Sequence, residues 1–424
     1  MSYIEKLLEG VDVEWKPLAD IAEIYGGLTG KSKADFESGN AKYISYKNIF
    51  NNIDVDPSQL ELVKVSENER QHKVRYGDIL FTGSSEIAVE AGMSSAVTID
   101  FKEPVYLNSF SFGVRFNDDV NLTPEFSKYL FRSTFMRAEI VKSASGVTRF
   151  NVSKARFKQI LVPIPCPDNP EKSLAIQAEI VRILDAFTAM TAELTAELTA
   201  ELNMRKKQYN YYRDQLLSFE ECEVEWKTLG WVGEVRMCKR IMKNETSDIG
   251  DIPFFKIGTF GKEPNAFISR DVFEEYKNKY NYPRVGEILI SASGTIGRAV
   301  IFNGEDAYFQ DSNIVWLEND ESKVLNKYLF YFYQIANWNV SDGGVIKRLY
   351  NDNIKKTLIP VPYPDDPERS LAEQSRVVAI LDKFDTLTTS LQEGLPHEIE
   401  LRQKQYEYYR DLLLNFPKPM EETA

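Results

Sequence analysis

Hydrophobic positions along the chain follow two different patterns. Apolar residues recur at helical spacing from Ser173 to Phe219, a span much longer than an ordinary globular helix. At ~1.5 Å per residue this helix would reach roughly 70 Å, which is typical of a coiled coil or an exposed spacer. Short β-rich runs separated by Gly, Asn and Asp fill about 16–160 and 227–357, and they predict two α+β domains. The strand predictions include YISYKNI (43–49), and the helix predictions are FSKYLFRSTF (126–135) and NKYLFYFYQI (326–335).

The long helical pattern occurs twice in the sequence. Residues 161–219 match residues 358–416 at a constant offset of 197 without a gap, and 31 of these 59 positions are identical. Shorter stretches outside this match also recur, so the sequence predicts an internal pseudo-twofold repeat. The predicted order is variable region, shared helix, variable region and shared helix, with boundaries at 1–160, 161–220, 221–357 and 358–424.

Local signals predict where the shared helices begin and break. Each helix follows a proline-rich run, which cannot continue a helix and fixes an extended approach. Ser173 and its equivalent Ser370 are expected either as N-caps or in the first turn. The runs PDNPEK and PDDPER are interpreted as turns that cap the helices rather than as nuclease elements. Gly394 and Pro396 predict a kink or a short break in the second copy.

The acidic charge of the chain lies mainly in the helices and the chain ends. A net charge of −13 alone argues weakly against a nucleic-acid-binding protein. However, region 16–160 holds 19 basic and 18 acidic residues, and region 234–357 holds 17 of each. The two globular regions are therefore neutral, and local basic strips stand out on them.

These basic strips occupy equivalent places. Residues 140–160 contain five basic residues and no acidic residue, and residues 343–356 contain four basic residues against Asp352 alone. Each strip follows a small-residue loop, SASG or SDGG, and precedes a proline-rich run. A basic strip beside a Gly-rich loop suits contacts to DNA phosphates. The alternative interpretation is a solvated basic surface.

Two further loops, FTGSSE (81–86) and SASGTIGR (291–298), follow equivalent predicted strands. Their hydroxyls and Arg298 could contact base edges, although ordinary turns are the alternative. The run GLTGKSK (27–33) is two residues shorter than a nucleotide-binding loop, and its charges suit DNA phosphates equally well. The residues predicted to contact DNA are Lys31, Lys33, Lys47, Thr82, Ser84, Ser85, Arg149, Lys154, Arg156, Lys158, Lys256, Ser291, Ser293, Thr295, Arg298, Lys347 and Arg348.

No catalytic residue is predicted. Only two histidines are present, His72 and His397, and neither lies in a Cys/His or acidic cluster. The sequence lacks GxSxG, HExxH and the Asn/Asp-Pro-Pro-Tyr/Phe tetrapeptide with which an adenine methyltransferase holds its flipped base. Cys166, Cys222 and Cys238 form no CxxC pair, so neither a disulfide framework nor a metal site is expected.

The beginning of the chain does not resemble a signal peptide. MSYIEKLLEG carries two glutamates where such a peptide requires an apolar run, and no segment approaches ~18 consecutive apolar residues. We therefore expect a soluble cytoplasmic protein without membrane contact.

Two divergent regions thus alternate with two near-identical helices that carry Gln-x-x-x-Val-x-x-Leu-Asp and end in KQYxYYRD. This arrangement resembles the specificity subunit of type I restriction–modification systems, and the TAEL block at 191–202 resembles that of the IC subfamily. The resemblance covers essentially the whole chain and is strongest over the two helices.

The resemblance implies an α+β fold in which two target-recognition domains are separated by two long antiparallel coiled-coil helices. Each domain would read one half of a bipartite, asymmetric site in double-stranded DNA. Two modification subunits, which bind S-adenosylmethionine and methylate adenine, would clasp the helices, and restriction subunits would then join. This chain would itself bind no cofactor. The residues predicted to contact the modification subunits are Gln177, Val181, Leu184, Gln374, Val378 and Leu381.

Two other classes of protein are compatible with parts of the sequence. A stand-alone methyltransferase or nuclease is disfavoured by the missing motifs. A coiled-coil scaffold that never contacts DNA is the remaining alternative.

The repeat TAELTAELTAEL raises the question of why a helix would repeat a four-residue unit. Each unit advances a helix by ~6 Å and turns it by ~400°, a net rotation of ~40°. One DNA base pair rotates the duplex by roughly 34–36°. The repeat is therefore predicted to set the gap between the two half-sites. The alternative is replication slippage in a tolerant exposed helix.

Overall fold

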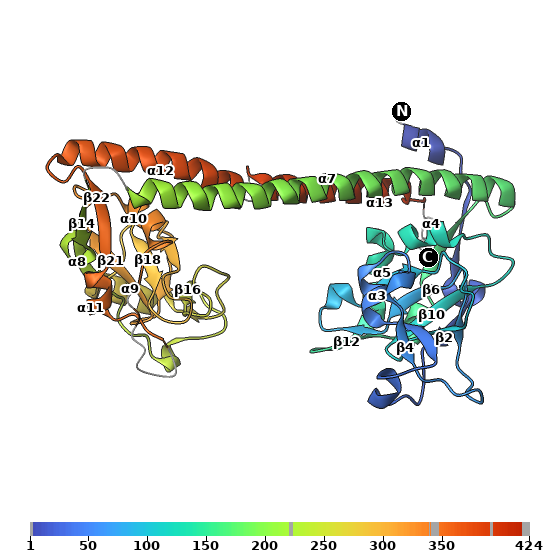
Figure 1. The fold of residues 1–424 in the computed structure, drawn as a ribbon. Coiled ribbons are helices and arrows are strands. Elements are labelled where there is room, and N and C mark those ends of the chain that lie inside the picture. Colours follow the sequence, from blue (N-terminus) through green and yellow to red (C-terminus); the bar gives the residue numbers. More distant parts are fainter. Residues whose placement is uncertain (1–2, 220–223, 339, 341–346, 391–392, 418–424) are drawn as a thin grey trace. The chain divides into compact units, whose positions relative to one another are not determined.

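Two compact units divide the chain. The computed structural model describes residues 3–219, 224–338, 340, 347–390 and 393–417. The first unit comprises residues 1–197 and 399–424, and the second comprises residues 198–398 (Figure 1). These units cut across the four predicted segments, because each unit takes part of both shared helices.

In its described part, the first unit contains thirteen strands: β1 (Val13–Pro17), β2 (Ala22–Gly26), β3 (Ala41–Ile44), β4 (Glu61–Val63), β5 (Lys73–Val74), β6 (Ile79–Thr82), β7 (Ser84–Ser85), β8 (Ser94–Ala96), β9 (Val105–Leu107), β10 (Ser111–Phe116), β11 (Ala144–Ser145), β12 (Phe150–Val152) and β13 (Leu161–Pro165). Its helices are α1 (Tyr3–Leu8), α2 (Leu18–Ile21), η1 (Lys33–Phe36), α3 (Tyr46–Asn51), η2 (Pro57–Gln59), η3 (Ala88–Glu90), α4 (Pro124–Leu130), α5 (Thr134–Ser143), α6 (Lys154–Phe157), the first part of α7 (Pro170–Ser218) and most of α13 (Leu395–Leu413).

Two four-stranded sheets form the body of the first unit. One sheet has the order β2–β10–β6–β8 and is antiparallel throughout. The other has the order β4–β3–β9–β5, in which β3 and β9 run parallel. A two-stranded ribbon, β1–β13, and a small sheet, β11–β12–β7, complete the unit.

The second unit contains nine strands within the described residues: β14 (Val224–Thr228), β15 (Gly233–Arg236), β16 (Ile252–Phe255), β17 (Phe267–Ile268), β18 (Ile288–Ser291), β19 (Ala299–Ile301), β20 (Tyr308–Phe309), β21 (Ile314–Asn319) and β22 (Leu358–Pro362). Its helices are the remainder of α7, α8 (Leu229–Val232), η4 (Lys243–Glu245), α9 (Arg270–Lys279), α10 (Asn326–Tyr333), α11 (Asn351–Lys356) and α12 (Pro367–Thr389).

The second unit repeats the main sheet of the first. The sheet β15–β21–β18–β19 has the same antiparallel order as β2–β10–β6–β8, and the ribbon β14–β22 matches β1–β13. The predicted pair of α+β domains with an internal repeat is therefore confirmed.

The long helices pack antiparallel within each unit. In the first unit Phe187 of α7 packs on Tyr409 of α13, with ring centroids 5.4 Å apart, and Thr188 donates to the Tyr406 hydroxyl at 3.1 Å. In the second unit Tyr212 of α7 stacks on Phe384 of α12 at 5.5 Å. The predicted long antiparallel helices are thus confirmed.

The helix ends match the sequence signals. The second shared helix is broken between Thr389 and Leu395, as Gly394 and Pro396 predict. Asp366 caps α12 by accepting from the Arg369 backbone NH at 3.1 Å, whereas Ser370 lies inside the first turn. The first-turn alternative therefore holds for Ser370 and, in α7, for Ser173.

Two local predictions need correction. The run 43–49 is not one strand, because β3 ends at Ile44 and α3 begins at Tyr46. Buried Asn48 explains the turn, since its side chain bonds both the backbone NH and the carbonyl of Asp56, at 3.0 and 2.8 Å. Similarly, the run 126–135 is split between α4 and α5, because the Ser133 hydroxyl caps the second helix.

No helix in the described part of the chain is long and apolar enough to cross a membrane.

Candidate nucleic-acid interface

In the first unit the predicted hydroxyl loop and the predicted basic strip form one surface. Ser84 of β7 pairs with Asn151 of β12. Arg149, which precedes β12, donates from Nε to the Ser84 hydroxyl at 3.0 Å, and its guanidinium carbon lies 5.8 Å from the centre of the Phe110 ring. We call Ser84, Phe110 and Arg149 the first loop cluster.

The backbone beneath the first loop cluster is held from both sides. The NH of Gly83 donates to the carbonyl of Phe110 at 2.7 Å, and the carbonyl of Gly83 accepts from the NH of Val152 at 2.9 Å. A Cβ at Gly83 would lie 2.6 Å from that Phe110 oxygen, so this close approach requires glycine. Three segments distant in sequence are therefore fixed against one another.

The second unit repeats this arrangement. Ser293 forms a β-bridge with Arg348, and its hydroxyl donates to Asn313 Oδ1 at 2.7 Å. The Arg348 guanidinium donates to the same oxygen and to the Ser312 carbonyl, both at 3.3 Å. We call Ser293, Asn313 and Arg348 the second loop cluster.

The backbone beneath the second loop cluster has the same hydrogen bonds as the first. The NH of Ala292 donates to the carbonyl of Asn313 at 2.7 Å, and the Ala292 carbonyl accepts from the NH of Leu349 at 2.8 Å. Asn313 therefore occupies the position that Phe110 occupies in the first unit. The small-residue loop SDGG (341–344) lies outside the described residues.

Several side chains that were predicted to contact bases are buried and form hydrogen bonds within the protein. The Thr82 hydroxyl is fully buried and accepts from the Met93 NH at 2.9 Å. The Ser85 hydroxyl accepts from the Ile87 NH at 3.1 Å. The Ser291 hydroxyl accepts from the Arg298 NH at 2.9 Å. The structure does not support direct base contacts for Thr82, Ser85 and Ser291, because these hydroxyls already stabilise the loops.

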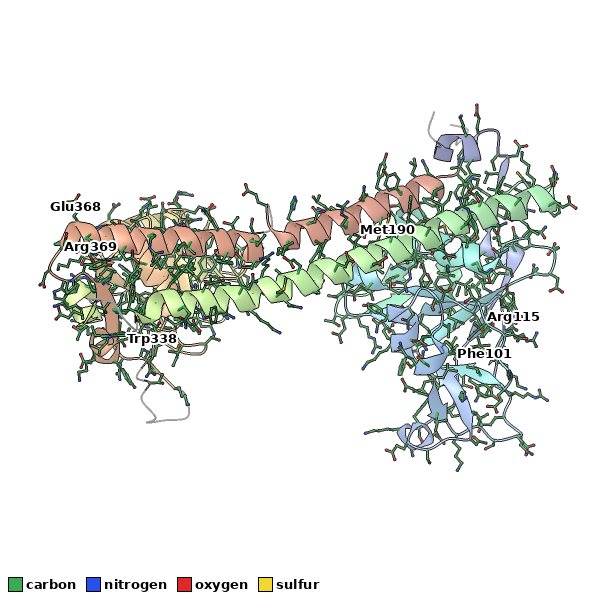
Figure 2. The ribbon with its side chains drawn as sticks, turned by 45° about the horizontal axis from the view of Figure 1, so that its top comes forward. Phe101, Arg115, Met190, Trp338, Glu368 and Arg369 are labelled. Carbon is green, nitrogen blue, oxygen red and sulfur yellow. The ribbon has the colours of Figure 1, made fainter. Side chains whose placement is uncertain are left out.

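Only some of the residues predicted to contact DNA in the loop 291–298 are exposed. Arg298 is half-buried, and its Nη1 donates to the Phe260 carbonyl at 2.9 Å, so part of its guanidinium already stabilises the fold. Gly297 has a φ of +79°, and a Cβ there would lie 2.4 Å from the Trp338 ring nitrogen. Trp338, labelled in Figure 2, thus packs under the loop, and Thr295 remains exposed at its tip.

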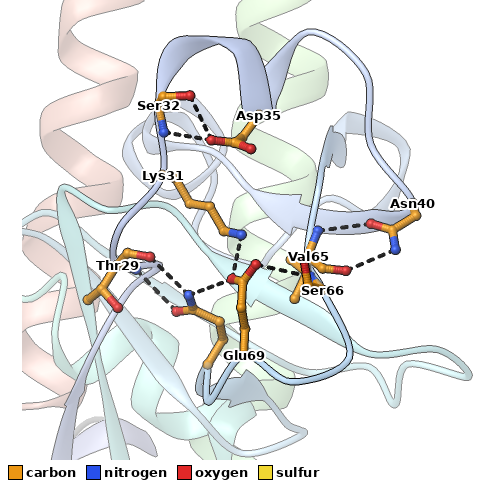
Figure 3. A network of polar contacts seen from close by, with 9 residues as sticks. Thr29, Lys31, Ser32, Asp35, Asn40, Val65, Ser66 and Glu69 are labelled. Atoms are coloured by element: carbon orange, nitrogen blue, oxygen red, sulfur yellow. Dashed lines mark hydrogen bonds and ion pairs between the residues drawn. The ribbon is translucent and has the colours of Figure 1, made fainter.

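The run GLTGKSK is held by internal contacts and is not a nucleotide-binding loop (Figure 3). The Gln71 side chain bonds the NH and the carbonyl of Thr29, at 3.1 and 2.9 Å. The Lys31 ammonium, whose side chain is only 4% exposed, forms an ion pair with Glu69. The hydrogen bond from Lys31 lowers the pKa of Glu69 to about 2. The structure therefore does not support a phosphate contact for Lys31.

A third group of predicted residues is exposed. These side chains form no ion pair within the described ranges, so their charge is available to an anionic partner. Phe157 explains the exposure on α6, because this fully buried ring packs edge-on to Phe81 and Phe112 and turns its basic neighbours outward. The exposed, unpaired residues are Lys33, Lys47, Lys154, Arg156, Lys158, Lys256 and Lys347.

A groove links part of this group to the first loop cluster. It has a volume of about 570 Å³, within the range of ligand-sized clefts, and its lining includes Lys33, Lys47, Tyr46 and Phe110. Phe110 itself is 66% exposed. Phe110 is not among the predicted contacts, because in the sequence it is one of several aromatic residues in SFSFGVRF (109–116), a pattern typical of a strand.

The six helix residues predicted to contact a partner lie against the chain's own domains. Gln177 is fully buried, and its amide bonds the Thr123 NH and the Asn121 carbonyl at 3.0 and 2.6 Å. Gln374 makes the equivalent bonds to Leu325 and Lys323 at 2.9 and 3.1 Å. The apolar members belong to the cores of their units or pack against them: Val181, Leu184, Val378 and Leu381.

Other repeated residues of the shared segments face outward. Tyr408 and Leu161 of the first unit are 63% and 45% exposed, and their equivalents in the second unit, Tyr211 and Leu358, are 61% and 48% exposed. We call Leu161 with Tyr408, and likewise Leu358 with Tyr211, a repeated apolar pair. Their equal exposure in both units makes them better candidates for a partner surface than the predicted residues.

Comparison with known proteins identifies the family. A family model described as the type I restriction modification DNA specificity domain matches residues 10–204 and again residues 222–401. The chain belongs to the type I restriction–modification DNA specificity family.

Full-length relatives within this family are closely similar. The chain is 46% identical over 424 residues to a Haemophilus influenzae protein described as a type I restriction enzyme specificity subunit, covering 98% of each chain. It is 37% identical over 437 residues to the EcoR124I/EcoR124II specificity subunit of Escherichia coli, covering 99% of this chain and 98% of the relative. The chain is accordingly a type I specificity subunit with two target-recognition domains.

A solved structure also shares the fold. It comes from work on complex assembly and conformational transition of the type I restriction–modification system, and it matches with a TM-score of 0.65 at 16% identity. The match covers 95% of this chain and 97% of that chain.

Proposed function

We propose that each target-recognition domain reads one half of a bipartite, asymmetric site in double-stranded DNA. The observation that carries this proposal is the repetition of the loop cluster. The same backbone hydrogen bonds present an arginine-centred cluster in each of two domains. A single chain with two such clusters suits a site of two different halves, because the side chains of the clusters differ.

The exposed basic residues supply the nonspecific part of this interaction. Lysine and arginine contacts to phosphates position a protein on DNA without reading sequence. Lys154, Arg156 and Lys158 lie beside the first loop cluster in sequence, and Lys347 adjoins Arg348 of the second. Phosphate contacts would thus flank each cluster.

The partners follow from the repeat. The same two apolar residues are exposed in each unit, Leu161 and Tyr408 in the first and Leu358 and Tyr211 in the second, which suits two copies of one partner. We infer that these copies are modification subunits, which bind S-adenosylmethionine and methylate adenine, and that restriction subunits join the resulting complex in the cytoplasm. The present chain would then supply recognition, while its partners supply the chemistry.

Exchange of the first recognition domain tests the proposal. Residues 16–160 would be replaced by the equivalent domain of a related subunit, and methylated adenines would be mapped by long-read sequencing. We expect one half of the methylated motif to change and the other half to stay the same. A change in both halves would contradict independent reading. The absence of a salt-dependent gel shift of DNA, with or without a modification subunit, would favour a scaffold without DNA contact.

A further inference from the structure

The two loop clusters place different chemistry at one equivalent position. The backbone carbonyls of Phe110 and Asn313 each accept a hydrogen bond at 2.7 Å. The donor is the backbone NH of the residue that follows β6 or β18, namely Gly83 or Ala292. Each residue also lies next to an arginine side chain. One position is therefore apolar and the other is an amide, on the same backbone framework.

The backbone of Phe110 is held by hydrogen bonds, and its ring is exposed. Its backbone NH donates to Asn108 Oδ1 at 2.9 Å, and buried Asn108 is itself fixed by a bond from its Nδ2 to the Ser111 hydroxyl at 2.9 Å. The ring is 66% exposed and has no polar atom. In the major groove the 5-methyl group of thymine is the apolar feature that distinguishes one base, and phenylalanine is among the side chains that contact it.

Asn313 is oriented by its neighbours. Its Oδ1 accepts from Ser293 and Arg348 at 2.7 and 3.3 Å, which fixes the direction of the amide. Its Nδ2 has no hydrogen-bond partner in the part of the chain that the structure describes. A fixed amide donor without a partner suits an acceptor on a base edge, and N7 is an acceptor on both purines.

We propose that Phe110 and Asn313 are equivalent specificity-determining positions that read their half-sites by different chemistry. Phe110 contacts the 5-methyl group of a thymine in one half-site, and Asn313 Nδ2 donates to N7 of a purine in the other. This inference rests on the proposed function, and it adds the residue and the chemical group that each domain uses.

The experiment removes single groups from DNA. The complex of the full chain with its modification subunits is first used to map the methylated motif. Each thymine of the site is then replaced by uracil, and each purine by its 7-deaza analogue, one at a time. At one thymine, we expect uracil to weaken binding about fourfold, the effect of one buried methyl group. At one purine of the other half, the deaza analogue is expected to weaken binding about fivefold, the effect of one hydrogen bond.

Protein variants assign each effect to its residue. In Phe110→Ala the uracil effect should disappear and the deaza effect should remain. Asn313→Asp replaces the Nδ2 donor by a carboxylate oxygen, whose charge should also weaken binding to every DNA. Measured within this variant, the deaza effect should disappear and the uracil effect should remain. Leu62→Ala, a change at a 52% exposed apolar residue on β4, serves as the control and should preserve both effects.

The possible contrary outcomes are distinct. If no thymine is sensitive to uracil, or if the sensitivity persists in Phe110→Ala, the assignment of Phe110 is overturned. The corresponding deaza results decide Asn313. If a variant complex fails to assemble, the substitution scan with the unaltered complex still decides whether the two contacts exist. Absence of any bipartite motif for the unaltered complex would instead contradict the proposed function.

Discussion

Replacement of Lys154, Arg156 and Lys158 by alanine should weaken DNA binding without changing the sequence that is read. All three side chains are exposed, and none forms an ion pair within the described residues. Phe157 is the buried residue of α6 and is not changed. The one contact with the core that is lost is that of the Lys154 ammonium, 5.8 Å from the centre of the Phe112 ring. The expected loss is therefore electrostatic.

The magnitude follows from counterion release. Each phosphate contact contributes ~0.9 to the slope of log affinity against log salt, so the loss of ~3 contacts flattens that slope by ~2.7. Between ~50 and ~200 mM salt, the advantage of the unaltered complex over the variant should then shrink by roughly 40-fold. Titration of labelled DNA at several salt concentrations measures this difference directly.

A matched control separates local contacts from total charge. Lys42, Lys64 and Lys102 are also exposed, lie in the same unit and form no ion pair within the described residues. Their triple replacement by alanine removes the same charge but should flatten the slope much less. Equal slopes for the two triple variants, or a changed methylation motif at unchanged slope, would refute the phosphate role of the α6 strip.

Three further predictions concern the helices and the core. Deletion of residues 195–198, one TAEL unit, should leave both half-site sequences unchanged and shorten the gap between them by one base pair, and an unchanged gap with full methylation would show that the repeat does not set it. Leu184→Glu places a carboxylate at a fully buried position, so the free energy of unfolding of the first unit should fall by several kcal/mol. An unchanged thermal unfolding transition would contradict this prediction. Phe416→Ala truncates a ring that is 4% exposed and packs on Phe126, so differential scanning calorimetry should show the first unit destabilised by about 3–5 kcal/mol and the second unit unaffected.

The repeat made the architecture predictable from the sequence. A 59-residue match without a gap carries the proline entry, the helical spacing and the buried glutamine in both copies, so the shared helices and the twofold plan followed directly. The basic strips and hydroxyl loops were also found, but their meeting in one surface depends on long-range strand pairing between β7 and β12. Local sequence contains no signal for such a pairing.

Burial was the less predictable property. Ser291 and Thr295 occur in one small-residue loop, yet the first is 1% exposed and the second is exposed. The difference arises because the Ser291 hydroxyl closes the loop on Arg298. Likewise, Lys31 and Lys33 are two positions apart, but only Lys31 reaches Glu69. Hydrophobic periodicity predicts which face of a helix or strand is buried. It does not predict which acidic residue pairs with a loop lysine, because that residue lies in a distant part of the sequence.

Because the first unit is built from two segments that are far apart in the sequence, the two units cannot complete their folding in the order in which they are synthesised. Its core includes Leu413, Leu414 and Phe416, which are synthesised after the whole second unit. At about 5–20 residues per second, the stretch between Glu197 and Ile399 takes roughly 10–40 s to translate. Throughout that interval the nascent first unit lacks these three residues, which belong to the same core cluster as Ile180 and Leu184. The second unit, which is continuous in sequence, can acquire its native packing first, and the domain encoded first is completed last.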